Sequence, residues 1–412
     1  MGATATVITR LTRAQWIVLA LLVFSIAINY IDRGTLSVAA PFLAGELHLS
    51  KTQLGALFST FFWTYAAFQL VAGWLVDRYD VRWVLGLGFF IWSMATLLTG
   101  LAGSFAAIFA LRLLLGMGEA VAYPSYSRIL ASSFPERHRG TANALIDVGC
   151  KVGPAVGVLI GGLLVHQLGW RALFLALGSG CLVWLIPWGI WGPSPASIRT
   201  TRHQKAPGIV DILTQRAAWG TFLGLFCTNY AWYFLVFWLP SYLVMERHFS
   251  ASTMAVAGSL PFWGVAISSA ASGWASDLWI AHGGSPTRVR KTFMVGGMLL
   301  STMILSAVVV RDPGVCIFLL LLTSVSFGMF TSNLWAITQT LAGPDAAGKW
   351  TGWQNMFGNF AGLLGPWLTG KIVDTTGQFL LAFVAVCVAL IIGSVAFGVI
   401  IKEVKPVTWQ VH

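Results

Sequence analysis

In the stretch Gly73-Trp74-Leu75-Val76-Asp77, the pattern Gly-Trp-x-x-Asp recurs 200 positions later in Gly273-Trp274-Ala275-Ser276-Asp277. Asn29-Tyr30 recurs at the same offset as Asn229-Tyr230. Matches that share one offset and one order along the chain indicate an internal repeat. They predict a molecule built from two related halves.

Two further matches share an offset of 212. Gly116-Met117 corresponds to Gly328-Met329, and Gly153-Pro154 corresponds to Gly365-Pro366. A longer connection in the second half accounts for the change of offset. Gly and Pro also recur by chance in glycine-rich helices, but these matches are colinear and use only two offsets. We therefore interpret them as a repeat.

The composition is that of a membrane protein. Hydrophobic residues make up 57% of the chain and charged residues 9%, whereas a soluble domain carries about 25% charge. Apolar segments of about 20 residues are long enough to cross a hydrocarbon core of about 30 Å. We predict twelve such spans: 16–41, 53–76, 83–101, 104–127, 141–166, 170–191, 219–244, 251–276, 292–310, 313–341, 347–373 and 378–401.

The spans and the repeat together predict an all-α membrane protein with two pseudo-symmetric six-helix bundles. The expected divisions are an N-terminal bundle over 1–191, a linker over 192–217 and a C-terminal bundle over 218–412. The linker is polar, contains three prolines and four basic residues, and is typical of a connection outside the membrane.

The basic residues predict the orientation. The net charge is +11, and with both termini placed in the cytoplasm 17 of the 25 Lys and Arg residues fall on that side and five on the other. This is the positive-inside bias of multi-pass proteins. This bias accounts for the net positive charge, so no nucleic-acid-binding function is needed to explain it. We expect a monomer in the lipid bilayer of the inner (plasma) membrane.

Six ionisable side chains fall within the predicted helices of the N-terminal half. The equivalent positions of the repeat in the C-terminal half are uncharged. They are Asp32, Arg33, Arg112, Glu119, Asp147 and Lys151, and their counterparts are Trp232, Tyr233, Ser324, Thr331, Asn359 and Leu363. A charge near the bilayer centre costs a few kcal/mol on insertion scales, so such residues face a partner or a polar space. These six are the candidate functional residues.

Their spacing suggests shared surfaces. Arg112, Glu119 and Tyr123 lie at i, i+7 and i+11, on one face of a helix. Asp147 and Lys151 can pair at i,i+4. Two structural alternatives stay open. Arg112 ties helices together through backbone carbonyls, and Asp147 and Lys151 neutralise each other near the membrane surface.

Asp32 and Arg33 are sequence neighbours, so their side chains point about 100° apart and suit separate tasks. A buried carboxylate such as Asp32 or Glu119 needs a partner or takes up a proton, because desolvation disfavours its charged form. The guanidinium of Arg33 stays charged and forms a fork that matches a carboxylate.

Nothing in the sequence favours an enzyme. The five cysteines are scattered through apolar segments, and the seven histidines lie in loops or at helix ends without metal-ligand spacing. We expect no metal, no cofactor and no catalytic residues.

The stretch from Gly73 to Arg82 resembles the loop between helices 2 and 3 of the major facilitator superfamily, and Arg112-Leu-Leu-Leu-Gly-Met-Gly-Glu-Ala120 resembles its helix-4 motif. In this loop Gly73 is expected to allow close helix approach, and Asp77 to meet a helix end or a nearby Arg. The resemblance covers nearly the whole chain and implies a secondary transporter.

A narrower resemblance is to the anion:cation symporter family, which includes carriers of galactonate, glucarate and hexuronates. It rests on Asn29-Tyr-Ile-Asp-Arg-Gly-Thr-Leu-Ser-Val-Ala39, Gly118-Glu-Ala120, Pro124 and Asn355-Met-Phe-Gly-Asn-Phe-Ala-Gly362. It implies proton-driven import of a small organic anion. The roles that it implies are proton coupling by Asp32 and Glu119, anion binding by Arg33, and a site lined by Tyr30, Tyr65, Asn355 and Asn359.

Two departures leave the substrate open. Asp147 and Lys151 add charge where sugar-acid carriers have uncharged residues. A second cation beside Arg33 suits a dicarboxylate or a different acid, unless Asp147 neutralises it. The pattern Gly149-x-x-x-Gly153-Pro154-x-x-Gly157 partly resembles proton-coupled efflux antiporters, or serves only close helix packing. An efflux antiporter for amphipathic compounds is therefore the alternative function, and a channel is less consistent with the repeat.

Overall fold

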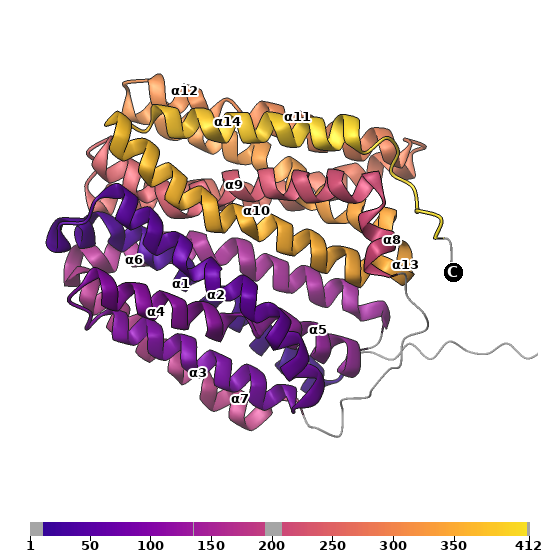
Figure 1. Cartoon of the computed structure of the whole chain (residues 1–412), viewed down its shortest axis with the longest axis horizontal. Helices are drawn as coiled ribbons and strands as arrows, with labels where there is room; N and C mark the ends of the chain where they lie inside the picture. Colours follow the sequence, from indigo (N-terminus) through magenta and orange to yellow (C-terminus); the bar gives the residue numbers. More distant parts are fainter. Residues whose placement is uncertain (1–10, 135, 194–207, 410–412) are drawn as a thin grey trace, which may run out of the picture.

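The computed structural model describes residues 11–134, 136–193 and 208–409, and these form a bundle of helices (Figure 1). The N-terminal half contains α1 Arg13–Leu47, α2 Lys51–Arg78, α3 Val81–Thr99, α4 Phe105–Glu119, α5 Ala122–Ser133, α6 Glu136–Val183 and α7 Leu185–Trp191. The C-terminal half contains α8 Ile209–Leu213, α9 Arg216–Met245, α10 Ala251–Ala281, α11 Pro286–Ser301, α12 Ile304–Val309, α13 Pro313–Thr376, α14 Leu380–Val395 and a π-helix at Ala396–Ile400.

The helices are of membrane-spanning length. Within the described residues, nine helical segments are long and apolar enough to cross a bilayer. One of them, Leu145–Trp191, is twice the length of a single span. The less apolar α2 has 28 residues, which is about 42 Å of helix. The predicted all-α membrane fold is confirmed. Residues 194–207 of the predicted linker lie outside the described residues.

Two pairs of predicted spans join without a loop. Spans 141–166 and 170–191 meet at Gly169, whose φ is 80°, and spans 313–341 and 347–373 meet at Gly343, whose φ is 66°. Glycine adopts positive φ at little cost because it has no Cβ. Each of these residues therefore allows the kink that separates two spans.

The predicted span 104–127 coincides with one apolar helical segment, Phe105–Leu130, which is interrupted between α4 and α5 after Glu119. Pro124 has no N–H to donate to the carbonyl of Ala120, four residues earlier. The divided helix ends at Glu119, one of the candidate functional residues. The span 170–191 is also interrupted, between α6 and α7, where Pro187 cannot donate to Val183.

Local geometry repeats between the halves. His48 and His248 both adopt left-handed backbone conformations, with φ of 52° and 55°. Ser50 and Ser250 each accept a hydrogen bond from the N–H three residues further on, at 3.1 and 3.2 Å. These two pairs have the offset of 200 found in the sequence, so the turn before α2 and the turn before α10 share one conformation.

Close glycine contacts repeat as well. A Cβ added at Gly153 would lie 2.6 Å from Cβ of Tyr30, and one at Gly365 would lie 3.1 Å from the ring of Tyr230. The glycines are 212 residues apart and the tyrosines 200. Each half therefore packs the same pair of helices through the same kind of contact.

The glycine series in α6 serves packing. Added Cβ atoms at Gly149, Gly153 and Gly157 would all approach within 3.2 Å of atoms in residues 23–31 of α1. Close helix packing, one of the two explanations that the sequence left open, therefore accounts for these glycines. It needs no likeness to an efflux antiporter.

The interpretation of Gly73 as a close-contact residue is wrong. A Cβ at Gly73 would meet no atom within 4 Å, so the residue faces open space at that position. The side chain of Asp77 is not among the side chains that the structure describes. In the other copy of the motif, Asp277 pairs with Arg290 at 3.2 Å, which links α10 to α11.

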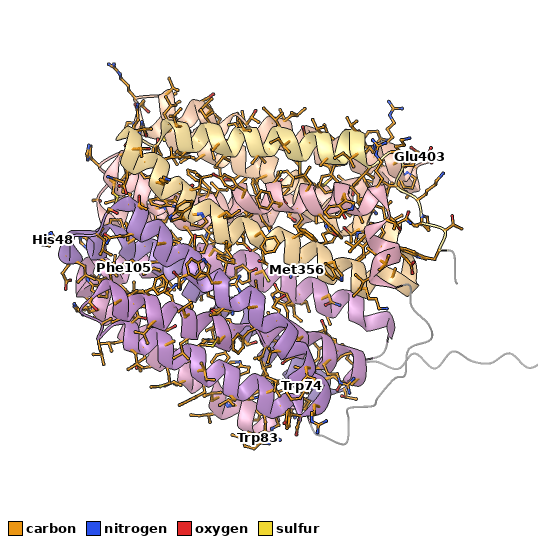
Figure 2. All side chains as sticks on the ribbon, in the orientation of Figure 1. His48, Trp74, Trp83, Phe105, Met356 and Glu403 are labelled. Atoms are coloured by element: carbon orange, nitrogen blue, oxygen red, sulfur yellow. The ribbon has the colours of Figure 1, made fainter. Side chains whose placement is uncertain are left out.

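The two halves touch at one end of the bundle. Figure 2 shows His48 at this end and Glu403 at the opposite one. Asp374 in α13 accepts hydrogen bonds from the N–H groups of Lys51 (3.0 Å) and Thr52 (2.6 Å), the first two residues of α2. Ser59 accepts a further bond from the N–H of Trp367 at 3.1 Å. These contacts join α2 of one half to α13 of the other at the His48 end.

Candidate functional site

Arg33 lies at the centre of the predicted charge cluster. Its side chain is buried on α1, its Nε donates to Oε2 of Glu119 at 3.0 Å, and its Nη2 lies 3.0 Å from the same oxygen. Glu119 is completely buried at the end of α4. The structure thus brings together a cation and a carboxylate that lie 86 residues apart. A buried pair of this kind is stable only while both partners remain.

Aromatic rings surround the Arg33 guanidinium. Its central carbon lies 4.8 Å from the ring centroid of Tyr30, 4.8 Å from that of Phe61 and 4.9 Å from that of Tyr65. Such cation–π contacts favour a fixed, desolvated guanidinium. Phe61 was not predicted, although it lies one helical turn before Tyr65 on α2. We call Arg33, Glu119, Tyr30, Phe61 and Tyr65 the Arg33 cluster.

Asp32 faces a different helix from Arg33. Its Oδ2 accepts a hydrogen bond from Oγ1 of Thr96 on α3 at 3.3 Å. Its Oδ1 is buried and has no hydrogen-bond partner among the described residues. The two neighbours on α1 therefore point in different directions, as the 100° step between them requires. Thr96 gave no signal in the sequence, because a threonine in an apolar helix is common.

Arg112 contacts the neighbouring helix α2. Its Nε lies 3.4 Å from the backbone carbonyl of Leu57, and its guanidinium lies 5.3 Å from the ring of Phe61. Phe61 thus contacts both buried arginines. The carbonyl contact is the one that the structural alternative for Arg112 requires.

Lys151 and Asp147 form the expected pair within α6. Their charged atoms are 3.8 Å apart, and the side chains are 21% and 56% exposed, respectively. The Nζ of Lys151 also lies 5.5 Å from the ring of Trp232 on α9. This lysine therefore reaches across from the N-terminal half to the C-terminal half.

The C-terminal half contributes neutral polar groups. The hydroxyl of Tyr233 on α9 donates to Oδ1 of Asn359 at 2.9 Å, and Nδ2 of Asn359 donates to the carbonyl of Asn355 at 2.9 Å. The Tyr233 ring packs 4.6 Å from that of Phe62 on α2. Tyr233 was not proposed as a site residue, although its position as the repeat counterpart of Arg33 could have indicated it.

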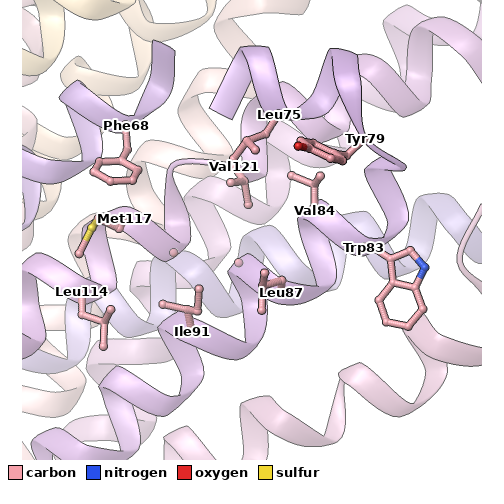
Figure 3. A pocket seen from close by; sticks show the side chains of 12 residues that line it. Phe68, Leu75, Tyr79, Trp83, Val84, Leu87, Ile91, Leu114, Met117 and Val121 are labelled. Carbon is pink, nitrogen blue, oxygen red and sulfur yellow. The ribbon is translucent and has the colours of Figure 1, made fainter. Parts of the chain in front are cut away.

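A second feature is an apolar groove of about 400 Å³ between α2, α3 and α4 (Figure 3). Phe68, Leu87 and Met117 are among its lining side chains, and none of the lining residues is charged. Leu87 and Trp83 are well exposed on the outside of the bundle. The groove is suited to lipid chains, and it holds none of the predicted site residues.

No metal centre is evident in the part of the chain that the structure describes. Groups of three or more His, Cys, Asp or Glu side chains that could hold a metal ion do not occur there. The five cysteines are buried and unpaired within these ranges.

The helix lengths, the apolar composition and the buried charge cluster define a multi-pass α-helical membrane protein. The chain belongs to the Major Facilitator Superfamily, whose sequence profile matches residues 22–366. It is 31% identical to a protein named probable galactarate/D-glucarate transporter GudP from Escherichia coli K12, over 98% of this chain and 96% of that protein. The hexuronate transporter of Bacillus subtilis is 30% identical, over 92% of each chain. A D-galactonate transporter of Escherichia coli O6:H1 is 28% identical over 96% of this chain and 97% of its own.

Solved structures share the fold. A bacterial homolog of the human lysosomal transporter Spinster, described as inward-facing and occupied, superposes with a TM-score of 0.82 at 18% identity, covering 96% of this chain and 98% of its own. The nucleoside transporter NupG gives a TM-score of 0.72 at 13% identity, covering 94% and 99%.

Proposed function

We propose that this protein is a secondary transporter that imports a sugar-acid anion together with protons, by alternating access, and acts as a monomer. Its curated relatives include proteins named as carriers of galactarate, D-glucarate, D-galactonate and hexuronate. The single observation that carries the proposal is the buried Arg33–Glu119 pair inside a ring of aromatic side chains.

The pair provides an exchangeable partner for a carboxylate. Glu119 neutralises Arg33 when no substrate is bound. A substrate carboxylate carries the same charge and can take the place of Glu119 on the guanidinium fork. Protonation of Glu119 would release Arg33 for this exchange. Burial of both carboxylates, Glu119 and that of the substrate, in their charged form beside the single cation Arg33 would be energetically unfavourable.

Asp32 supplies a second protonatable group next to the cluster. One of its oxygens is buried without a hydrogen-bond partner among the described side chains, which favours the neutral form of the acid. We assign Asp32 and Glu119 to proton coupling. We assign Arg33, Tyr30, Tyr65, Asn355 and Asn359 to the anion site, with Arg112, Asp147 and Lys151 as further charged groups.

Transport requires the two halves to rock about this site. The contacts of Asp374 with α2 hold the halves together at the His48 end. With both termini in the cytoplasm, that end faces outwards, and the site would open towards the cytoplasm. A proton that moves inward with the membrane potential contributes about 2.3 kcal/mol per 100 mV.

The test is uptake of D-galactonate and D-glucarate into proteoliposomes under an imposed inward proton gradient. Asp32→Asn and Glu119→Gln should lose gradient-driven accumulation and retain exchange of labelled for unlabelled anion. Glu46→Gln is the matched control, because Glu46 pairs with Arg171 at the His48 end, away from the Arg33 cluster. Full accumulation by both cluster variants contradicts the coupling role, and no uptake of any sugar acid by the native protein contradicts the function.

A further inference from the structure

Lys151 and Arg33 are each paired with a carboxylate, but the two pairs differ in strength. The Arg33–Glu119 pair is fully buried, and two guanidinium nitrogens lie 3.0 Å from one oxygen. The Lys151–Asp147 distance of 3.8 Å is beyond hydrogen-bond length, and Asp147 is 56% exposed. Exposed pairs of this kind contribute little. Lys151 is therefore a cation that a ligand can recruit without a large loss.

Contacts connect both cations to the same short stretch of α9, one directly and one through intervening rings. The Nζ of Lys151 lies 5.5 Å from the ring of Trp232. The next residue, Tyr233, packs against Phe62 at 4.6 Å. Phe62 contacts Phe61 at 5.0 Å, and the ring of Phe61 lies 4.8 Å from the Arg33 guanidinium. Trp232 thus contacts Lys151 directly, and Tyr233 is connected to Arg33 through two phenylalanine rings.

The charges of the region also balance in a specific way. The candidate residues of the N-terminal half comprise three cations, Arg33, Arg112 and Lys151, and three carboxylates, Asp32, Glu119 and Asp147. If the two proton-coupling carboxylates are neutralised, the region has an excess of two positive charges. A monoanion would leave one of them uncompensated in a low-dielectric environment, whereas a dianion would compensate both.

We infer that the protein selects sugar diacids over sugar monoacids, and that Lys151 binds the second carboxylate while Arg33 binds the first. This inference rests on the proposed function and specifies the substrate class of the same site. The polyhydroxy chain between the two carboxylates would lie along Trp232 and Tyr233. Lys151 is then the residue that sets specificity.

The experiment compares the affinities of the purified full-length protein for D-glucarate, a dianion at neutral pH, and D-galactonate, a monoanion, by calorimetry. Lys151→Gln should lower the ratio of D-glucarate to D-galactonate affinity at least tenfold, and Lys151→Arg should restore most of it. Lys371→Gln is the matched control, because Lys371 also stacks on a tryptophan, Trp367, at 5.3 Å. It should leave the ratio unchanged.

Asp147→Asn separates ligand binding from simple pairing. If Lys151 binds a carboxylate, removal of the competing Asp147 charge should raise the ratio. If Lys151 only neutralises Asp147, both variants should leave the ratio unchanged, which overturns the inference. A native protein that binds D-galactonate but not D-glucarate also overturns the inference and leaves the proposed function standing. Binding of neither acid contradicts the proposed function itself.

Discussion

Arg33 shows what can be read at the scale of one residue. Its charge within an apolar segment made it a candidate functional residue, because an isolated cation is costly in a membrane. The sequence could not assign its partner, since Glu119 lies 86 residues away on another helix. Nor could it predict that Tyr30, Phe61 and Tyr65 contact the guanidinium, because that depends on how α1 and α2 pack.

Replacement of Arg33 by lysine tests the role of the guanidinium fork. Arg33→Lys keeps the positive charge but removes the planar pair of donors that matches a carboxylate. We expect at least a tenfold loss of sugar-acid affinity, about 1.4 kcal/mol, measured by calorimetry. Arg171→Lys, which alters an arginine paired with Glu46 at 2.7 Å at the end of the bundle, should leave the affinity unchanged. Equal affinity in the native protein and Arg33→Lys would show that charge alone suffices.

At the scale of the helices, proline and glycine set the boundaries. The predicted spans coincide with helices, but the sequence did not predict the short interruptions after Glu119, Val183 and Ser301. Periodicity and hydropathy indicate which face of a helix is apolar. They do not show where one backbone hydrogen bond is missing, as it is at Pro124. The glycines of α6 gave a visible pattern. Only the contacts with α1 assign that pattern to packing.

Gly153→Ala tests the close approach of α6 to α1. The new Cβ would lie 2.6 Å from Cβ of Tyr30 and 2.8 Å from the carbonyl oxygen of Ala27, and overpacking of this kind costs about 1–3 kcal/mol. We expect a lower thermal unfolding midpoint in detergent. Gly180→Ala in the segment of α6 after Gly169, where a Cβ would meet no atom within 4 Å, should leave the midpoint unchanged or raise it. Equal midpoints for the two variants would remove close packing as the reason for the glycine.

At the scale of the whole molecule, the halves are alike in scaffold and unlike in charge. The contacts of Gly153 with Tyr30 and of Gly365 with Tyr230 recur at the repeat offsets. The buried cation–carboxylate pair belongs to the N-terminal half, while Trp232, Tyr233 and Asn359 supply neutral contacts from the other half. A site at such a junction changes its exposure when the halves move relative to each other.

Asp374→Ala should favour separation of the halves at the His48 end. The Asp374 carboxylate accepts hydrogen bonds from two backbone N–H groups of α2 in the other half. Loss of these bonds would shift the equilibrium between the closed and separated states of this end by about 1 kcal/mol. Spin labels at Gly45 and Gln378 should report a larger population of long distances. The five native cysteines are buried, which limits background labelling.

Glu46→Ala is the control for this distance measurement. Glu46 lies near the same end, but its partners Trp170 and Arg171 belong to its own half. The distance distribution should therefore not change. An unchanged distribution in Asp374→Ala would show that the Asp374 contact does not hold that end closed.

The sequence by itself determined the membrane-spanning helical class, the repeat and the six unusual charges, because composition, offset and hydropathy are local properties of the chain. Only the tertiary structure decided which charges meet. It paired Arg33 with Glu119, turned Asp32 towards Thr96 and placed Lys151 on Trp232 of the opposite half. These partners are distant in sequence. Their meeting depends on the packing and rotation of whole helices, which no pattern within a single span reports.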